Sequence, residues 1–145
     1  MTIQRMDHIG LVVDDLDAAM AFFVELGFKP GGKGQVEGDL VDRIIGLEGV
    51  RTEVAMIETP DGNGRLELIA FHSPPAQDGD AAGPANTKGI RHIAFVVDDI
   101  DDVLARLRNH GAELVGHVVR YGNSFRLCYI RGPEGIIVEL AERIS

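Results

Sequence analysis

The sequence contains one motif twice, at an offset of eighty-four residues. Residues 7–17 are Asp-His-Ile-Gly-Leu-Val-Val-Asp-Asp-Leu-Asp, and residues 91–101 are Arg-His-Ile-Ala-Phe-Val-Val-Asp-Asp-Ile-Asp. The histidine, the isoleucine, the paired valines and the aspartates all match at that one offset. Agreement this dense indicates an internal repeat, and two copies are too few for a solenoid. We therefore expect a tandem duplication of one supersecondary unit.

Each copy is predicted to begin with a strand followed by a helix. Residues 6–13 alternate and are mostly apolar or β-branched, which predicts a strand. One of the two aspartates that follow caps a helix that ends at Gly27, and the second copy repeats the pattern up to Gly111. Further strand patterns occupy residues 50–59 and 65–71 in the first copy and 113–119, 125–131 and 136–141 in the second.

These elements predict an α+β fold in which each copy is a βαβββ module. The first module covers about residues 4–71 and the second about residues 90–145, and together they form a single domain over residues 1–145. Residues 72–89, rich in Pro, Gly and Ala, are predicted to be the linker. A Gly-rich segment at 31–39 is followed by a short amphipathic piece at 40–47, which has no counterpart in the second copy and is therefore interpreted as an insertion.

Composition limits the classes of partner. The chain has 145 residues and a formal net charge of −9, which argues against nucleic acid and against anionic membrane surfaces as partners. No apolar run approaches the ~20 residues needed to cross a bilayer. The start of the chain lacks the pattern of an export signal, and the lone cysteine, Cys128, fits a reducing compartment. We expect a cytoplasmic protein in which Cys128 packs in the core.

Two histidines and two glutamates fall at corresponding places in the two copies. His8 and His92 belong to apolar strand patterns, and Glu67 and Glu139 interrupt the apolar run in the last strand of each copy. A single strand histidine is more often a hydrogen-bonded core residue, and a single strand glutamate more often faces solvent. A carboxylate in an apolar strand is costly unless it is paired or bound to a metal. Imidazole and carboxylate ligands suit Fe, Ni, Mn, Co or Zn, so the duplicated set predicts a site for a divalent metal.

The two motifs, together with Gly-Pro-Glu-Gly-Ile-Ile-Val-Glu-Leu at residues 132–140, resemble the vicinal oxygen chelate superfamily. That superfamily includes glyoxalase I, methylmalonyl-CoA epimerase, extradiol dioxygenases, fosfomycin-resistance enzymes and bleomycin-resistance proteins. The resemblance implies two βαβββ modules that form a cupped mixed β-sheet cleft around a metal. It also implies that the metal ligands are His8, Glu67, His92 and Glu139.

The resemblance further implies a class of reaction. Dioxygenases use two histidines and one carboxylate and keep positions open for substrate and O₂, whereas Glu67 would add a fourth protein ligand. A four-ligand set resembles the glyoxalase I and epimerase branch, in which the metal acts as a Lewis acid and a carboxylate, here Glu139 or Glu67, moves a proton. The alternatives are a non-haem Fe(II) dioxygenase and a binding protein of the bleomycin-resistance type.

The expected partners are a small-molecule substrate and a second copy of the chain. Members of such a family commonly dimerise, and the edges of the two predicted sheets need covering. Four polar residues at the turn before the strand predicted at 125–131 are candidates for binding an anionic substrate. Alternatively, they form a polar hairpin turn without a binding role. These residues are Arg120, Tyr121, Asn123 and Arg126.

Overall fold

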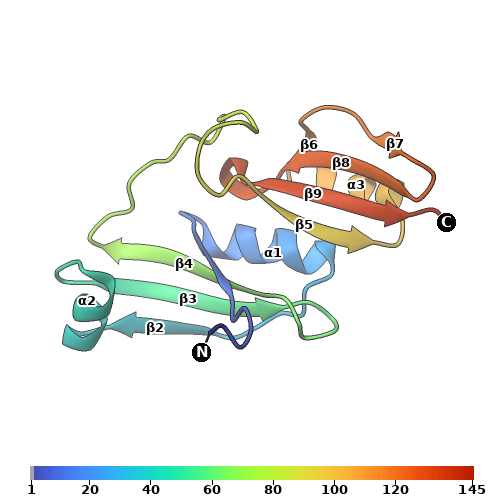
Figure 1. The fold of residues 1–145 in the computed structure, drawn as a ribbon. Helices are drawn as coiled ribbons and strands as arrows, with labels where there is room; N and C mark the ends of the chain where they lie inside the picture. Colours follow the sequence, from blue (N-terminus) through green and yellow to red (C-terminus); the bar gives the residue numbers. More distant parts are fainter. Residues whose placement is uncertain (1) are drawn as a thin grey trace. The chain divides into compact units, whose positions relative to one another are not determined.

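The structure is a computed structural model that describes residues 2–145, and these residues form two compact units. The first unit ends at Asp78 and the second begins at Gly79. Each unit contains one repeat motif and one mixed β-sheet with a helix against it, as Figure 1 shows for each unit separately. This arrangement confirms the predicted α+β fold built from two βαβββ-like modules.

The first unit contains a four-stranded sheet in the order β1-β4-β3-β2. Strands β1 and β4 are parallel, and the other neighbouring pairs are antiparallel. The elements are β1 (Ile9–Val12), α1 (Leu16–Leu26), β2 (Lys33–Glu37), α2 (Asp39–Ile45), β3 (Arg51–Glu58) and β4 (Arg65–Ser73). Helix α2 is the predicted insertion, and the described residues of the second unit contain no helix at the corresponding place.

The second unit contains a five-stranded sheet in the order β5-β9-β8-β6, with β7 also paired to β8. Strands β5 and β9 are parallel, as β1 and β4 are in the first unit. The elements are β5 (His92–Val97), α3 (Ile100–Arg108), β6 (Glu113–Leu114), β7 (Val119–Tyr121), β8 (Phe125–Arg131), the short 3₁₀ helix η1 (Pro133–Gly135) and β9 (Ile137–Arg143).

The repeated aspartates start the helices as predicted. The side chain of Asp15 accepts a hydrogen bond from the Ala18 backbone N–H at 2.9 Å, and the side chain of Asp99 accepts one from the Asp102 N–H at 3.2 Å. Each bond satisfies a backbone donor that the first turn of a helix leaves free. The matching aspartates Asp15 and Asp99 therefore have a structural role as helix caps.

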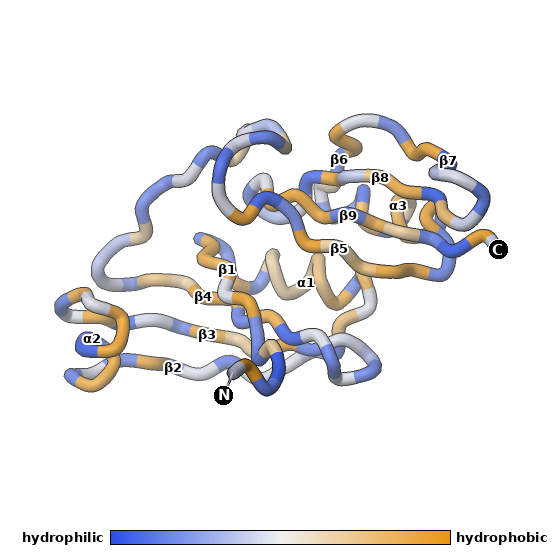
Figure 2. Tube along the Cα trace, viewed as in Figure 1, coloured by the Kyte–Doolittle hydropathy of each residue, from blue (hydrophilic) through white to orange (hydrophobic). Residues whose placement is uncertain are grey.

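The core of each unit lies between its helix and one face of its sheet. Helix α1 packs on β3 and β4 (Figure 1), and its Phe22 and Phe23 are buried together with Leu66 and Leu68 of β4. Figure 2 shows apolar residues concentrated on α1 and the strands, whereas the chain that leaves β4 is mostly hydrophilic. Side chains alternate along a strand, so Glu67, between the two buried leucines, lies on the face away from α1.

Strand β2 was not predicted. Its five residues are all exposed, so no alternation of apolar and polar residues marks them in the sequence. The strand forms through backbone pairing with β3, from Lys33 opposite Ala55 to Glu37 opposite Arg51. Just before it, Gly31 packs so closely on β3 that a Cβ atom there would lie 1.9 Å from the carbonyl oxygen of Met56. The glycine therefore permits the close approach.

The strand predicted at 113–119 is divided into β6 and β7. The Val115 N–H donates to the carbonyl of Tyr129, and pairing resumes only with Val119 opposite Leu127. Residues 116–118 therefore loop out of the edge of the sheet, opposite Cys128, as an irregular bulge. The sequence patterns assign residue ranges to seven strands, and β2 and this division bring the number in the described residues to nine.

Part of the segment between the two repeat copies is hydrogen-bonded to β8 of the second unit. The guanidinium of Arg131 donates hydrogen bonds of 2.7–3.3 Å to the backbone carbonyl oxygens of Ala81, Ala82, Gly83 and Gly135. Strand β4 also continues to Ser73, slightly past the predicted end of the first module. Within residues 2–145, no helix combines the length and the apolar composition that a membrane span requires.

Candidate functional site

In the second unit, His92 and Glu139 face each other on neighbouring strands. The Nε2 atom of His92 lies 3.2 Å from Oε1 of Glu139. The hydroxyl of Tyr129 lies 3.3 Å from Nδ1 of His92, and the two rings pack with their centroids 4.8 Å apart. The carboxylate of Glu139 is four-fifths buried, whereas His92 is more exposed. Tyr129 and Glu139 are opposite each other in the β8–β9 register, so the three side chains share one face of the sheet.

In the first unit, His8 and Glu67 form the corresponding pair. The Nε2 atom of His8 lies 3.7 Å from Oε1 of Glu67. The other ring nitrogen, Nδ1, donates a hydrogen bond of 2.6 Å to the carboxylate of Asp7. Asp7 is held in turn by Arg5 at 3.1 Å and by Arg65 at 3.4 Å. These hydrogen bonds, first that of His8 and then that of Arg5, lower the pKa of Asp7 below its ordinary value of 3.8.

The two pairs have the same place in the strand register. Glu67 is opposite Gly10, and Glu139 is opposite Ala94. Each histidine precedes that opposite residue by two positions, so it reaches the glutamate diagonally across a parallel strand pair. The equivalence predicted from the repeat is therefore present within each unit.

The surroundings of the histidines differ from the prediction. His8 does not lie inside a strand but directly before β1, and His92 is the first residue of β5. Both histidines are exposed. Neither is therefore a buried core histidine, which was the alternative to a metal ligand. The apolar residues that follow each histidine point alternately to the two sheet faces, and only one of these faces carries a helix.

The chemistry of each pair is suited to a metal ligand set. The Nδ1 atom of His8 faces Asp7, so the ring nitrogen available to an ion is Nε2, the atom nearest Glu67. Ligand atoms typically lie about 2.1 Å from an ion such as zinc, so donors 3.2–3.7 Å apart can contact the same ion. Within residues 2–145, no three metal-binding side chains gather in one cluster, so each unit presents a two-donor pair.

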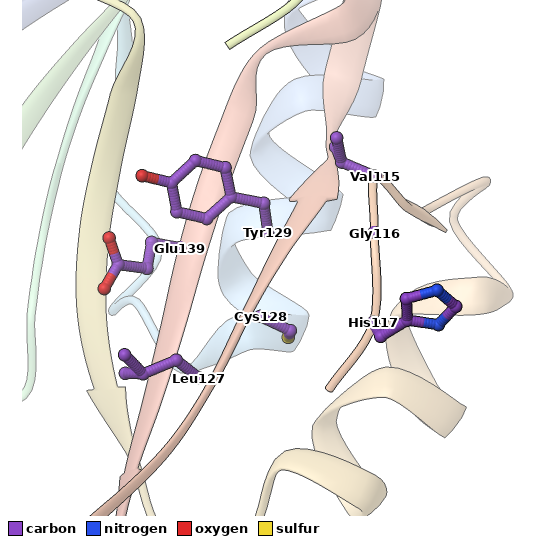
Figure 3. A pocket seen from close by; sticks show the side chains of 7 residues that line it. All are labelled: Val115, Gly116, His117, Leu127, Cys128, Tyr129 and Glu139. Carbon is purple, nitrogen blue, oxygen red and sulfur yellow. The ribbon is translucent and has the colours of Figure 1, made fainter. Parts of the chain in front are cut away.

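A cavity of about 370 Å³ opens beside Glu139 in the second unit. Figure 3 shows that it lies between strand β8 and the chain at Val115 and Gly116, with the carboxylate of Glu139 and the hydroxyl of Tyr129 on one side. The imidazole of His117 points away from Cys128 in this view. The complete lining is Val115, Gly116, His117, Leu127, Cys128, Tyr129 and Glu139.

The four predicted substrate residues lie around the β7–β8 hairpin. Arg120 and Tyr121 are exposed on β7, and Asn123 is in the turn. Arg126 is on β8, where its guanidinium pairs with Asp101 at 3.2 Å and with Glu142 at 3.3 Å. These contacts place it in the packing of α3 rather than beside Glu139. Of the described residues that line the cavity, none belongs to this set.

Cys128 is buried in the core, as predicted. Burial raises the pKa of its thiol above the ordinary value of 9.0, so the thiol is protonated at neutral pH. A protonated thiol is a poor nucleophile. Cys128 therefore contributes packing and not covalent chemistry.

Two residues of the site, Asp7 and Tyr129, were not predicted. Asp7 has a sequence signal, because it directly precedes the repeated histidine and its counterpart in the second copy is the oppositely charged Arg91. The sequence signal for Tyr129 is weaker, because this residue lies in an apolar strand pattern outside the repeated motif. Its contact with His92 depends on the pairing of β8 with β9, which the sequence does not specify.

Comparison with known proteins places the chain in a family. Residues 5–140 match the model of the Glyoxalase/Bleomycin resistance protein/Dioxygenase superfamily. The chain is 46% identical to a glyoxalase family protein from Bacillus cereus whose crystal structure is known, with a TM-score of 0.96 over 100% of this chain and 97% of that one. It is 32% identical to the uncharacterised protein YwbC of Bacillus subtilis, over 97% of this chain and 98% of YwbC.

A more distant structure shares the fold alone. The trypanothione-dependent glyoxalase I of Leishmania major is 22% identical, with a TM-score of 0.65 over 97% of this chain and 87% of that one. The family model spans nearly the whole chain, and each unit is the βαβββ-like module that the duplicated motif predicts. The protein therefore belongs to the Glyoxalase/Bleomycin resistance protein/Dioxygenase superfamily.

Proposed function

We propose that the protein is a metal-dependent lyase or isomerase of the glyoxalase type. In this proposal His8, Glu67, His92 and Glu139 together bind one divalent ion, which is Ni, Co, Mn, Zn or Fe. The substrate is a small molecule that chelates the ion through two oxygen atoms. The observation that carries the proposal is the duplicated His–Glu pair, which has the same strand register in both units.

The residues around the pairs have distinct tasks in this mechanism. When bound, a divalent ion acts as a Lewis acid that stabilises negative charge developing on the substrate oxygens. Asp7 holds Nδ1 of His8 and so fixes the direction of Nε2, while Tyr129 packs against the ring of His92. Glu139 borders the cavity, which favours it over Glu67 as the carboxylate that takes a proton from a carbon beside the carbonyl and returns it to the product.

We also propose that the chain forms a homodimer. Strands β1 and β5 are edges of their sheets, and each carries an exposed valine, Val12 at 51% and Val96 at 74% exposure. An unpaired edge with apolar side chains tends to associate with another protein surface. A second copy of the chain is the partner that is always present at matching concentration.

The metal content of purified protein tests the proposal. Protein prepared without chelator is compared by elemental analysis with Glu67→Ala and Glu139→Ala, and with Glu53→Ala as a control carboxylate on the adjacent strand β3. We expect wild type and the control to retain one divalent ion per chain and both ligand variants to lose it. Hemithioacetals of 2-oxoaldehydes and 2-acyl thioesters are then the substrates to assay.

Two other results would replace the proposal. If Glu67→Ala keeps iron and the protein consumes O₂ with a catechol, the two-His, one-carboxylate dioxygenase is the correct function. If wild type retains no ion after reloading with any of the five metals, the chain is a binding protein without metal chemistry.

A further inference from the structure

We propose that the cavity beside Glu139 receives an apolar group of the substrate, so that the preferred ligands carry an aryl or branched alkyl substituent next to their chelating oxygens. The inference rests on the proposed metal site and extends it to a class of ligand.

The bulge in the edge of the second sheet creates this cavity. Pairing along β8 is continuous from Arg131 to Tyr129, and it then breaks until Leu127 meets Val119. The two extra residues lift the edge chain away from β8 opposite Cys128. A regular edge strand would place backbone there, so the irregularity is what leaves the space open.

The walls of the cavity are apolar, and its polar groups lie at one side. Val115 and Leu127 contribute aliphatic surface, and Gly116 contributes no side chain. The carboxylate of Glu139 and the hydroxyl of Tyr129 lie on the side away from the bulge, and the ring of His117 is directed elsewhere (Figure 3). A ligand whose oxygens approach Glu139 therefore meets hydrocarbon surface toward Val115. Such a division between polar and apolar ends is typical of small-molecule sites.

The cavity is large enough for a substituent of this kind. Its volume of about 370 Å³ lies within the usual range for small-molecule pockets. A Cβ atom at Gly116 would meet no atom within 4 Å, so the space next to the bulge is open. A methyl group would leave most of this volume unfilled, whereas a phenyl ring would exchange water for contact with the apolar walls.

Two hydroxamates that differ in one group provide the test. Acetohydroxamate and benzohydroxamate both chelate metal ions through two oxygens, and they carry a methyl and a phenyl group respectively. Their affinities for the nickel-loaded protein are measured by calorimetry and normalised to their affinities for free Ni²⁺. We expect benzohydroxamate to bind at least about tenfold more tightly after normalisation, because its ring is buried.

A substitution in the cavity and a matched one outside it locate the effect. Val115→Phe extends a side chain into the cavity, and Val119→Phe makes the same change on exposed β7, outside the lining. We expect Val115→Phe to reduce the phenyl preference to less than about threefold, and Val119→Phe to preserve it. Both sites are more than two-fifths exposed, and circular dichroism checks that both variants are folded.

The outcomes separate this inference from the function on which it rests. Retention of nickel with equal normalised binding of the two hydroxamates in wild type overturns the cavity assignment and leaves the metal site standing. A phenyl preference that survives Val115→Phe also overturns it, because the ring then binds elsewhere. A protein that binds neither nickel nor hydroxamate overturns the proposed metal site, and the ligand class with it.

Discussion

His92 and Glu139 approach each other to 3.2 Å across the parallel strands β5 and β9, and the diagonal relation is the one that joins His8 to Glu67 in the first unit. The residues that support the two histidines differ. A carboxylate holds His8, whereas a phenol packs against His92. The duplicated strands thus keep the same donor pair while the contacts behind it have diverged, and the two halves are expected to respond differently to substitution.

Asp7→Asn tests the support of His8. A carboxylate bound to the second ring nitrogen fixes the tautomer and orientation of a ligating histidine, and loss of such a partner typically costs about 10–100-fold in metal affinity. We expect a loss in that range, measured by competition with a chromophoric chelator. Asp61→Asn is the matched control, since Asp61 is also an exposed hydrogen-bonded carboxylate with a lowered pKa, but it lies in the β3–β4 turn. Equal losses in both variants would contradict the role of Asp7.

Arg126→Met should reduce stability and leave metal affinity unchanged. Arg126 joins Asp101 to Glu142, and Glu142 also accepts a hydrogen bond from the Ile100 N–H at the start of α3. Loss of the exposed hydrogen bonds to Asp101 and of the part-buried one to Glu142 is expected to lower the free energy of unfolding in urea denaturation, and by more than the control does. Lys29→Met, which breaks an exposed pair with Glu58, should stay within about 0.5 kcal/mol. A loss of metal or hydroxamate binding in Arg126→Met would support the substrate role instead.

Gly31→Ala should be strongly destabilising. The added Cβ would lie 1.9 Å from the Met56 carbonyl oxygen, so β2 and β3 would have to separate. We expect a loss of about 2 kcal/mol or more in the free energy of unfolding. Gly34→Ala is the control within β2, because its Cβ would meet no atom within 4 Å. Similar thermal melting of the two variants would show that the approach of the strands is not tight.

Cys128 should make stability fall at alkaline pH. The thiol ionises near 9.0 in the unfolded chain and at a higher pH in the folded one, because burial raises its pKa. Between these two pKa values the unfolded chain binds fewer protons, so the free energy of unfolding decreases as pH rises. Urea denaturation between about pH 8 and pH 10 is expected to show a flatter decline in Cys128→Val than in wild type. Parallel pH profiles for the two proteins would mean that the thiol ionises equally in both states.

The sequence predicted the parts of the fold that depend on local pattern. The helices begin at the predicted aspartates, and the strands with alternating residues, such as β4, are present. Strand β2 was not predicted because its residues are exposed and pair with β3 through their backbone, which leaves no pattern in the sequence. The bulge at residues 116–118 was not predicted because apolar residues on both sides of Gly116 and His117 are typical of one continuous strand, whereas the pairing to β8 breaks there.

The candidate site also contains residues that the sequence pattern predicts and residues that it does not. The repeat was sufficient to pair each histidine with its glutamate, because duplicated units place equivalent residues at equivalent positions. Asp7 and Tyr129 depend on side-chain directions and strand register that no repeat specifies. Arg126 is a candidate substrate residue because it is charged and near a turn, and side-chain alternation places it on the sheet face of Cys128 rather than that of Tyr129.

Arg131 donates hydrogen bonds to Ala81, Ala82 and Gly83, so the second structural unit begins well before its first strand, β5. A peptide that starts at residue 90, near the point where the sequence repeat resumes, would lack the three carbonyl oxygens that accept these hydrogen bonds from the guanidinium. A peptide that starts at Gly79 would keep them. An attempt to produce the second half as an autonomous protein should therefore begin at Gly79, where its contacts begin, and not at residue 90, where the sequence repeat resumes.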